Sequence, residues 1–101
     1  MTEYEKEVET ALCKMIQRHG GRCLKFVCPG WSGVPDRILL LPGGRVVFVE
    51  LKRPKGGSAS KLQRFWHDEL NRLGFMSLFI HTKDSIAGLE LALFGGGGYA
   101  V

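Results

Sequence analysis

Two acidic side chains and one lysine stand out within the most apolar part of this 101-residue sequence. Glu50 and Lys52 are separated only by Leu51, in a segment rich in valine. Because successive side chains of a strand alternate between its faces, Glu50 and Lys52 are expected to point to the same side. Charged groups on a buried sheet face are costly unless they pair or bind something. The spacing therefore indicates a binding or catalytic site.

Asp36 joins this pair through an expected β-hairpin. Two runs rich in Ile, Leu and Val, residues 37–41 and 45–52, flank a Pro-Gly-Gly sequence that predicts an antiparallel hairpin. If a three-residue loop at 42–44 closes it, Asp36 falls directly opposite Glu50, with Cβ atoms roughly 4.5 to 5.5 Å apart. Two carboxylates this close repel each other, and a hard divalent cation removes the repulsion by binding oxygen from both. The register therefore predicts a Mg²⁺ or Mn²⁺ site.

A metal ion held by two carboxylates is suited to chemistry on phosphate groups. It keeps coordination positions for water and a phosphate oxygen, lowers the pKa of the water and neutralises charge that develops during phosphoryl transfer. Lys52 would lie beside this water, where it can orient or help to deprotonate the nucleophile and stabilise the transition state. The three side chains thus favour phosphoryl transfer to water.

The first part of the sequence predicts a helix followed by a strand. Thr2 and Glu5 have capping-box spacing, and apolar residues then recur at helical intervals, so residues 3–18 are expected to be helical. Residues 23–28 mix β-forming side chains and end at Pro29-Gly30, which predicts a strand closed by a turn.

Further elements are expected after the hairpin. Ser60 and Gln63 form a second capping-box pattern, and apolar spacing predicts a helix over 61–73 that ends at Gly74. Residues 75–81 are expected to form a buried strand, and Asp84 is expected to cap a last helix that runs to Leu93.

The expected order is α-β-β-β-α-β-α, which is typical of an α/β fold with one mixed central sheet and helices on both faces. Residues 1–101 are expected to form a single domain. The basic, glycine-containing segment 53–58 is expected to be an exposed, mobile loop, and 94–101 a flexible tail.

Composition narrows the class of protein. With 45% hydrophobic and 24% charged residues, the chain has ordinary globular composition. Its apolar stretches are far shorter than the roughly 20 residues that span a bilayer, so a cytoplasmic protein is expected. The three cysteines form no CxxC pair, which favours reduced thiols over a disulfide framework or zinc site. A net charge of +4 is compatible with a polyanionic partner.

These motifs resemble a known family. The string GVPDRILLLPGGRVVFVELKRP at 33–54, with SKLQRFWHDELNRLGF at 60–75 after it, closely resembles the VRR-NUC domain of the PD-(D/E)xK nuclease superfamily. Pro35-Asp36 looks like the PD element, and the segment from Glu50 to Lys52 looks like the ExK element. The resemblance runs from about Glu5 to Thr82, and a stand-alone copy of this size is similar to bacteriophage versions.

The resemblance implies roles for individual residues. It implies that Asp36, Glu50 and the Leu51 carbonyl bind the metal, that Lys52 is catalytic, and that Gln63 supports the site from the second helix. Gln63 can equally close the capping box with Ser60, and the two roles are compatible.

A glutamate on the first helix should complete the site, and the sequence offers three. Glu5 is already explained as the capping-box partner of Thr2, whereas Glu9 flanks the apolar face beside Leu12. Glu9 is therefore favoured over Glu5 and Glu7.

In function, the resemblance implies a Mg²⁺- or Mn²⁺-dependent endodeoxyribonuclease that is selective for branched DNA such as Holliday junctions. It would act as a homodimer, in the cytoplasm of a bacterial host. Two alternatives stay open: a monomeric nicking or flap nuclease, and a catalytically inactive nucleic-acid-binding module.

The basic residues outside the motifs and Trp31 each have two possible roles. The basic side chains are either solubilising charges or phosphate contacts that position DNA without reading its sequence. Trp31 either stacks on a base or is buried. The basic residues concerned are Arg37, Arg53, Lys55, Lys61 and Arg64.

Overall fold

The computed structural model describes residues 3–53 and 57–95, which form one four-stranded sheet and three helices. Their order along the chain is the expected one. The elements are α1 (Glu3–Arg18), β1 (Arg22–Lys25), β2 (Arg37–Leu41), β3 (Arg45–Leu51), α2 (Lys61–Arg72), β4 (Met76–Ile80) and α3 (Asp84–Phe94).

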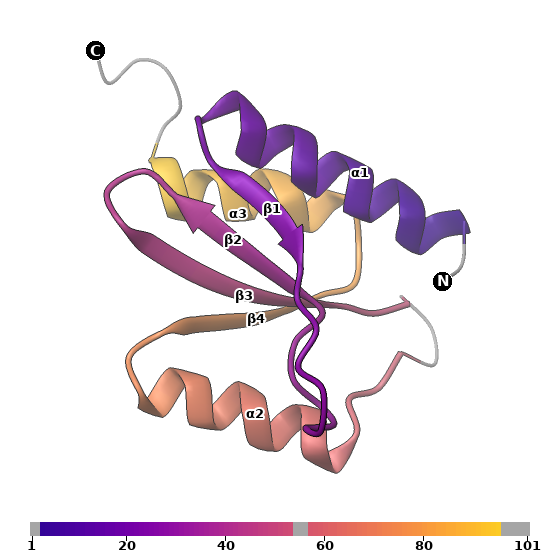
Figure 1. Cartoon of the computed structure of the whole chain (residues 1–101). Coiled ribbons are helices and arrows are strands. Elements are labelled where there is room, and N and C mark those ends of the chain that lie inside the picture. Colours follow the sequence, from indigo (N-terminus) through magenta and orange to yellow (C-terminus); the bar gives the residue numbers. More distant parts are fainter. Residues whose placement is uncertain (1–2, 54–56, 96–101) are drawn as a thin grey trace.

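The sheet is mixed, with strand order β1-β2-β3-β4. β1, β2 and β3 pair antiparallel, and β4 pairs parallel to β3. Helix α2 connects the two parallel strands, as the crossover between parallel neighbours requires. α1 and α3 lie together on one face of the sheet and α2 lies alone on the other (Figure 1). The predicted α/β architecture, with helices on both faces, is confirmed.

The hairpin of β2 and β3 has the predicted register. Leu41 pairs with Arg45 and Arg37 pairs with Val49. The loop between the strands contains two glycines with positive φ, 83° and 77°, a conformation that residues with a Cβ rarely adopt. One further step along the same register places Asp36 opposite Glu50.

The apolar core lies between the sheet and the α1/α3 pair. It combines alternate residues of the central strands with one stripe of each helix, and Leu12 and Leu39 in it have no exposed surface. Burial of each such side chain contributes about 1.5 to 3 kcal/mol to folding. The strand residues of the core are Leu39, Leu41, Val47, Val49, Leu51 and Ile80, and the helix residues are Val8, Leu12, Met15, Ile16, Ile86, Leu89 and Leu93.

The predicted bounds of β1 and the predicted cap of α3 were wrong. β1 covers Arg22–Lys25 instead of 23–28. The amide of Phe26 donates to the carbonyl of Asp36 at 2.8 Å, and beyond this hydrogen bond the chain leaves the sheet. Asp84 does not cap α3: the cap position is Lys83, without a side-chain hydrogen bond. The hydroxyl of Thr82 instead accepts from the amide of Ser85 at 3.3 Å.

Some expectations concern residues that the structure does not describe. These are the capping role of Thr2, residues 54–56 of the expected loop at 53–58, and the expected tail beyond Gly95. Phe94, which was expected to belong to the tail, is the last residue of α3 and stacks on His19 with ring centroids 3.9 Å apart. Among the described residues, none of the helices is long and apolar enough to cross a membrane.

Candidate active site

The open end of the β2–β3 hairpin carries a polar cavity of about 370 Å³. It brings together the PD and ExK elements, the first helix and the residues on either side of 54–56. The cavity is lined by Glu5, Asp36, Glu50, Leu51, Lys52, Arg53, Gly57 and Ser58.

Asp36 and Glu50 share the sheet face that is turned toward α2. Glu50 is a buried residue between Val49 and Leu51, whose side chains enter the core on the opposite face. The Asp36 carboxylate accepts a hydrogen bond from the Leu51 amide, with 3.3 Å between Oδ1 and N. This contact holds Asp36 against the end of β3. The hairpin register therefore places two carboxylates side by side, as predicted.

The electrostatics of the two carboxyls show why their proximity is costly. Burial, reinforced by the negative charge of Asp36, raises the pKa of Glu50 to about 7. Burial also raises the pKa of Asp36, although the Leu51 amide acts in the opposite direction. Raised carboxyl pKa values are typical of acids that are partly removed from water and lie near other negative charges, and such groups cluster at functional sites.

Lys52 lies on the same side as the acids and contacts α2. Its Nζ donates to Oε1 of Gln63 at 2.5 Å. The same oxygen accepts from the Ser60 amide at 2.9 Å, while the Gln63 amide donates to the Ser60 hydroxyl at 3.1 Å. Gln63 thus closes the capping box of α2 and also positions Lys52, so both expected contacts coexist.

A close packing contact fixes the loop that leads into Asp36. A Cβ placed on Gly33 would lie 2.6 Å from Cβ of Leu62, far too close for any side chain. Gly33 also has φ +88°, which favours glycine. The absence of a side chain lets the loop rest on the first turn of α2, which brings Asp36 and Gln63 to the same end of the sheet.

On α1, the structure separates the roles of two glutamates. Glu5 lines the cavity, and its charge acts on the Glu50 carboxyl, whose pKa it helps to raise. Glu9 forms an ion pair with Arg37. Although the charge of Glu9 also reaches Asp36, this geometry favours Glu5 as the first-helix member of the site. Glu5 and Glu9 are one turn apart on the same helix face, so the position of Glu9 beside Leu12, on which the prediction rested, did not show which of them lines the cavity.

The donor atoms suit a hard cation that keeps part of its hydration shell. Within residues 3–53 and 57–95, no three His, Cys, Asp or Glu side chains converge closely enough to bind a metal by themselves. Mg²⁺ is commonly held by only one or two carboxylates, with water and substrate phosphate oxygens filling the other positions. Asp36 and Glu50, together with the Leu51 carbonyl, match that requirement.

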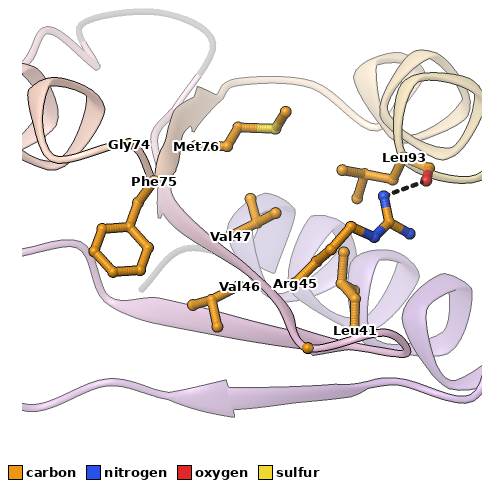
Figure 2. A pocket seen from close by; sticks show the side chains of 9 residues that line it. Leu41, Arg45, Val46, Val47, Gly74, Phe75, Met76 and Leu93 are labelled. Carbon is orange, nitrogen blue, oxygen red and sulfur yellow. Dashed lines mark hydrogen bonds between the residues drawn. The ribbon is translucent and has the colours of Figure 1, made fainter.

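A second cavity, of about 340 Å³, lies at the opposite end of the hairpin and differs in character. Figure 2 shows it lined mainly by apolar side chains such as Leu41, Val47 and Met76. The guanidinium of Arg45 points to the carbonyl of Leu93 and donates to it at 2.8 Å. No acidic residue is found among the described residues that line this cavity. The paired carboxylates and the lysine are therefore concentrated at one end of the sheet.

Comparisons with known proteins found a related phage protein and a solved structure with the same fold. No family model matches the sequence. A protein named "Putative nuclease p44", from Acyrthosiphon pisum secondary endosymbiont phage 1, is 38% identical over 80 residues, which are 79% of this chain and 85% of that protein. A solved structure described as "VRR_NUC domain" superimposes with a TM-score of 0.83, over 92% of this chain and 99% of that chain, at 22% identity.

Proposed function

Since the chain belongs to the family of the phage protein named "Putative nuclease p44" and has the fold of a VRR_NUC domain, we propose that it is a Mg²⁺- or Mn²⁺-dependent endodeoxyribonuclease. The observation that carries this proposal is the half-buried carboxyl of Asp36 beside the buried carboxyl of Glu50, with Lys52 in the same cavity. When bound, the metal would supply Lewis-acid activation of water and neutralise charge on the phosphate.

The side chains of the cavity have distinct tasks. Asp36, Glu50 and the Leu51 carbonyl hold the cation, and the Leu51 amide keeps the Asp36 carboxylate in place. Lys52, oriented by Gln63, aligns the attacking water and stabilises the extra negative charge of the transition state. Glu5 extends the acidic rim from α1. Arg53 supplies a positive charge at the rim for the DNA backbone.

Branched DNA is the substrate that the resemblance to the VRR-NUC domain implies, and the number of sites bears on how such DNA would be cut. One cavity cuts one strand at a time, whereas symmetric resolution of a branched substrate needs two cuts. A two-fold dimer supplies two such sites from a chain of this size. We therefore infer that the protein acts as a homodimer on branched DNA such as Holliday junctions, in the cytoplasm of the cell that makes it.

The test is cleavage of a labelled four-way DNA junction beside linear duplex, with Mg²⁺, Mn²⁺ or EDTA. Paired symmetric cuts are expected with either metal and none with EDTA or with Lys52→Ala. Native mass under the same conditions should give twice the mass of the chain. Cuts by a protein of monomer mass would favour a nicking or flap nuclease. Metal-independent binding without cleavage would favour an inactive binding module.

Glu5→Gln and Glu9→Gln form a matched pair that tests the first-helix carboxylate. Glu5→Gln should weaken metal-dependent cleavage with little effect on thermal stability, because Glu5 lines the cavity. Glu9→Gln should lower thermal stability through loss of the Arg37 ion pair, with a smaller effect on cleavage. The reverse pattern would show that Glu9, and not Glu5, is the first-helix carboxylate of the active site.

A further inference from the structure

Beside the catalytic cavity lies a smaller pocket of different chemistry, with a volume of about 160 Å³. We refer to it as the aromatic pocket. It is formed between the loop after β1, the sheet and α2. Its principal lining residues are Phe26, Trp31, Pro35, Phe48, Trp66 and Leu70.

The aromatic pocket and the catalytic cavity are neighbours along two segments of the chain. Pro35 lines the pocket and Asp36, the next residue, lines the cavity. Phe48 lines the pocket and shares a strand face with Glu50 two residues later, a separation of roughly 6.6 Å along a strand. A group bound in the pocket would therefore lie about one nucleotide away from a phosphate at Asp36 and Glu50.

The pocket has a fixed wall and an open one. Trp66 is held in place, since its Nε1 donates to the Ser32 carbonyl at 3.1 Å. Phe26 and Phe48 pack edge to face, with ring centroids 5.5 Å apart. Trp31 contacts Trp66 edge to face at 5.8 Å, yet 63% of Trp31 remains exposed. An indole that exposes this much surface beside a rigid aromatic floor offers a plane on which another ring can stack.

Charge identifies the kind of ring. No charged residue is found among the described residues that line the pocket. The adjoining cavity is lined by the acids Glu5, Asp36 and Glu50 as well as by Lys52 and Arg53, so it would accept an anionic group only with the cation of the proposed function. With that cation, a matching ligand is a neutral planar ring joined to a phosphate, which describes a nucleotide. The pocket admits a single ring system. A stable interface with a second copy of the chain would instead need roughly 1,000 Å² or more of contact.

Building on the proposed nuclease function, we propose that the aromatic pocket receives one unstacked nucleobase adjacent to the phosphate that is cut, with Trp31 as the stacking side chain. Because a base must leave the duplex stack to reach the pocket, the enzyme favours DNA in which a nucleotide at the cut site is already unpaired. Branch points and bulges meet this condition and a continuous duplex does not.

The experiment compares two DNA duplexes, one fully paired and one with a single unpaired 2-aminopurine, whose fluorescence falls on stacking. Affinity and fluorescence are measured with Mg²⁺ in the Lys52→Ala background, so that binding is read without cleavage. Trp31→Ala is added to this background, with Trp31→Phe as the conservative variant. Leu91→Ala is the matched control, because Leu91 is 61% exposed on α3, on the other face of the sheet.

We expect quenching on binding, and Trp31→Ala should abolish it. The preference for the unpaired substrate should then fall by about 5- to 100-fold, the range expected for one base stacked on one aromatic side chain. Trp31→Phe should keep most of the preference, and Leu91→Ala should keep all of it. The two tryptophans of the chain allow a second readout, since Trp66→Phe leaves Trp31 as the only indole and its emission should fall on binding.

Three outcomes would overturn the inference. The first is an unchanged preference and unchanged quenching in Trp31→Ala. The second is an equal loss of affinity for both duplexes, which would make Trp31 a general contact. The third is conversion of a dimer to a monomer by Trp31→Ala, which would make the pocket part of an interface between copies. The unaltered chain could cut no DNA while its preference for the unpaired substrate still depends on Trp31. That result would contradict the proposed nuclease function but support the binding of a base in the aromatic pocket.

Discussion

The two faces of the sheet are closed to very different degrees. On the α1/α3 face, alternate strand residues and one stripe of each helix form a continuous core from which water is excluded. On the α2 face, none of the 12 residues of α2 is buried, and Leu62, Phe65 and Leu73 are each more than half exposed. Yet Glu50, Lys52 and Phe48 lie on this second face. One face of the sheet therefore supplies most of the stability, and the other presents the chemistry.

This division has a physical reason. A carboxylate pair costs free energy wherever it is buried, and a closed core would leave no room for substrate. On an open face, a cation and a substrate can bind to the carboxylates and offset that cost in free energy. Single substitutions on either face can separate the contribution to stability from the contribution to chemistry.

Substitution at the carboxylate pair should separate activity from stability. Asp36→Asn removes one metal ligand and is expected to lower cleavage by about 100-fold or more. Because it also removes a buried charge that repels Glu50, thermal stability should not fall. Junction cleavage and thermal unfolding would be measured together. Asp68→Asn, on the exposed part of α2, is the control, and a similar loss of cleavage there would contradict the assignment.

A leucine deletion on each face tests where the stability resides. Leu12→Ala on the closed face should lower the free energy of unfolding by about 2 to 5 kcal/mol, because it leaves a cavity in a packed core. Leu73→Ala on the α2 face, where the side chain is 55% exposed, should cost less than about 1 kcal/mol. Urea unfolding of both variants gives the comparison. Equal losses would show that the two faces contribute alike.

The raised pKa of Glu50 predicts a specific pH dependence. Its pKa is about 7 in the folded chain against an ordinary value of 4.5, so the folded state binds the proton more tightly. Without metal, the Glu50 contribution should therefore favour folding at low pH and be lost as pH rises from 4.5 to 7. A pKa unit corresponds to 1.36 kcal/mol, so the rise from 4.5 to about 7 makes the loss about 3 kcal/mol.

Glu50→Gln should remove this dependence and stabilise the metal-free protein at pH 8. In the unaltered chain, Mg²⁺ should restore stability above pH 7, where Glu50 is ionised, and cleavage should increase over the same range. Urea unfolding at several pH values, with and without Mg²⁺, measures both effects. A metal-free stability that rises between pH 5 and 8 by the same amount in both proteins would contradict the role of Glu50.

The smallest effect concerns the two functions of Gln63. Ser60→Ala removes the helix cap alone and should cost about 1 kcal/mol of stability. Gln63→Ala should cost a similar amount of stability but lower cleavage further, since it also removes the partner of Lys52. Thermal unfolding and cleavage rates of the two variants separate the contributions. Equal cleavage rates in Ser60→Ala and Gln63→Ala would show that Gln63 acts only as a capping residue.

The strand and helix order and the hairpin register were predictable because they depend on local features of the sequence. Side-chain alternation placed Glu50 and Lys52 on one face, and the Pro-Gly-Gly loop placed Asp36 opposite Glu50. Both follow from backbone geometry within about 20 residues, so no knowledge of distant packing was required.

The tertiary structure alone decided which distant groups reach the site. Glu5 and Glu9 share a helix face, and only the packing of α1 on the sheet directed Glu9 to Arg37 and Glu5 to the cavity. Likewise, the exposure of Trp31 depends on how its loop rests on α2. The spacing of residues along the chain determines what one strand or helix presents, whereas contacts between elements depend on how side chains far apart in the sequence fit together.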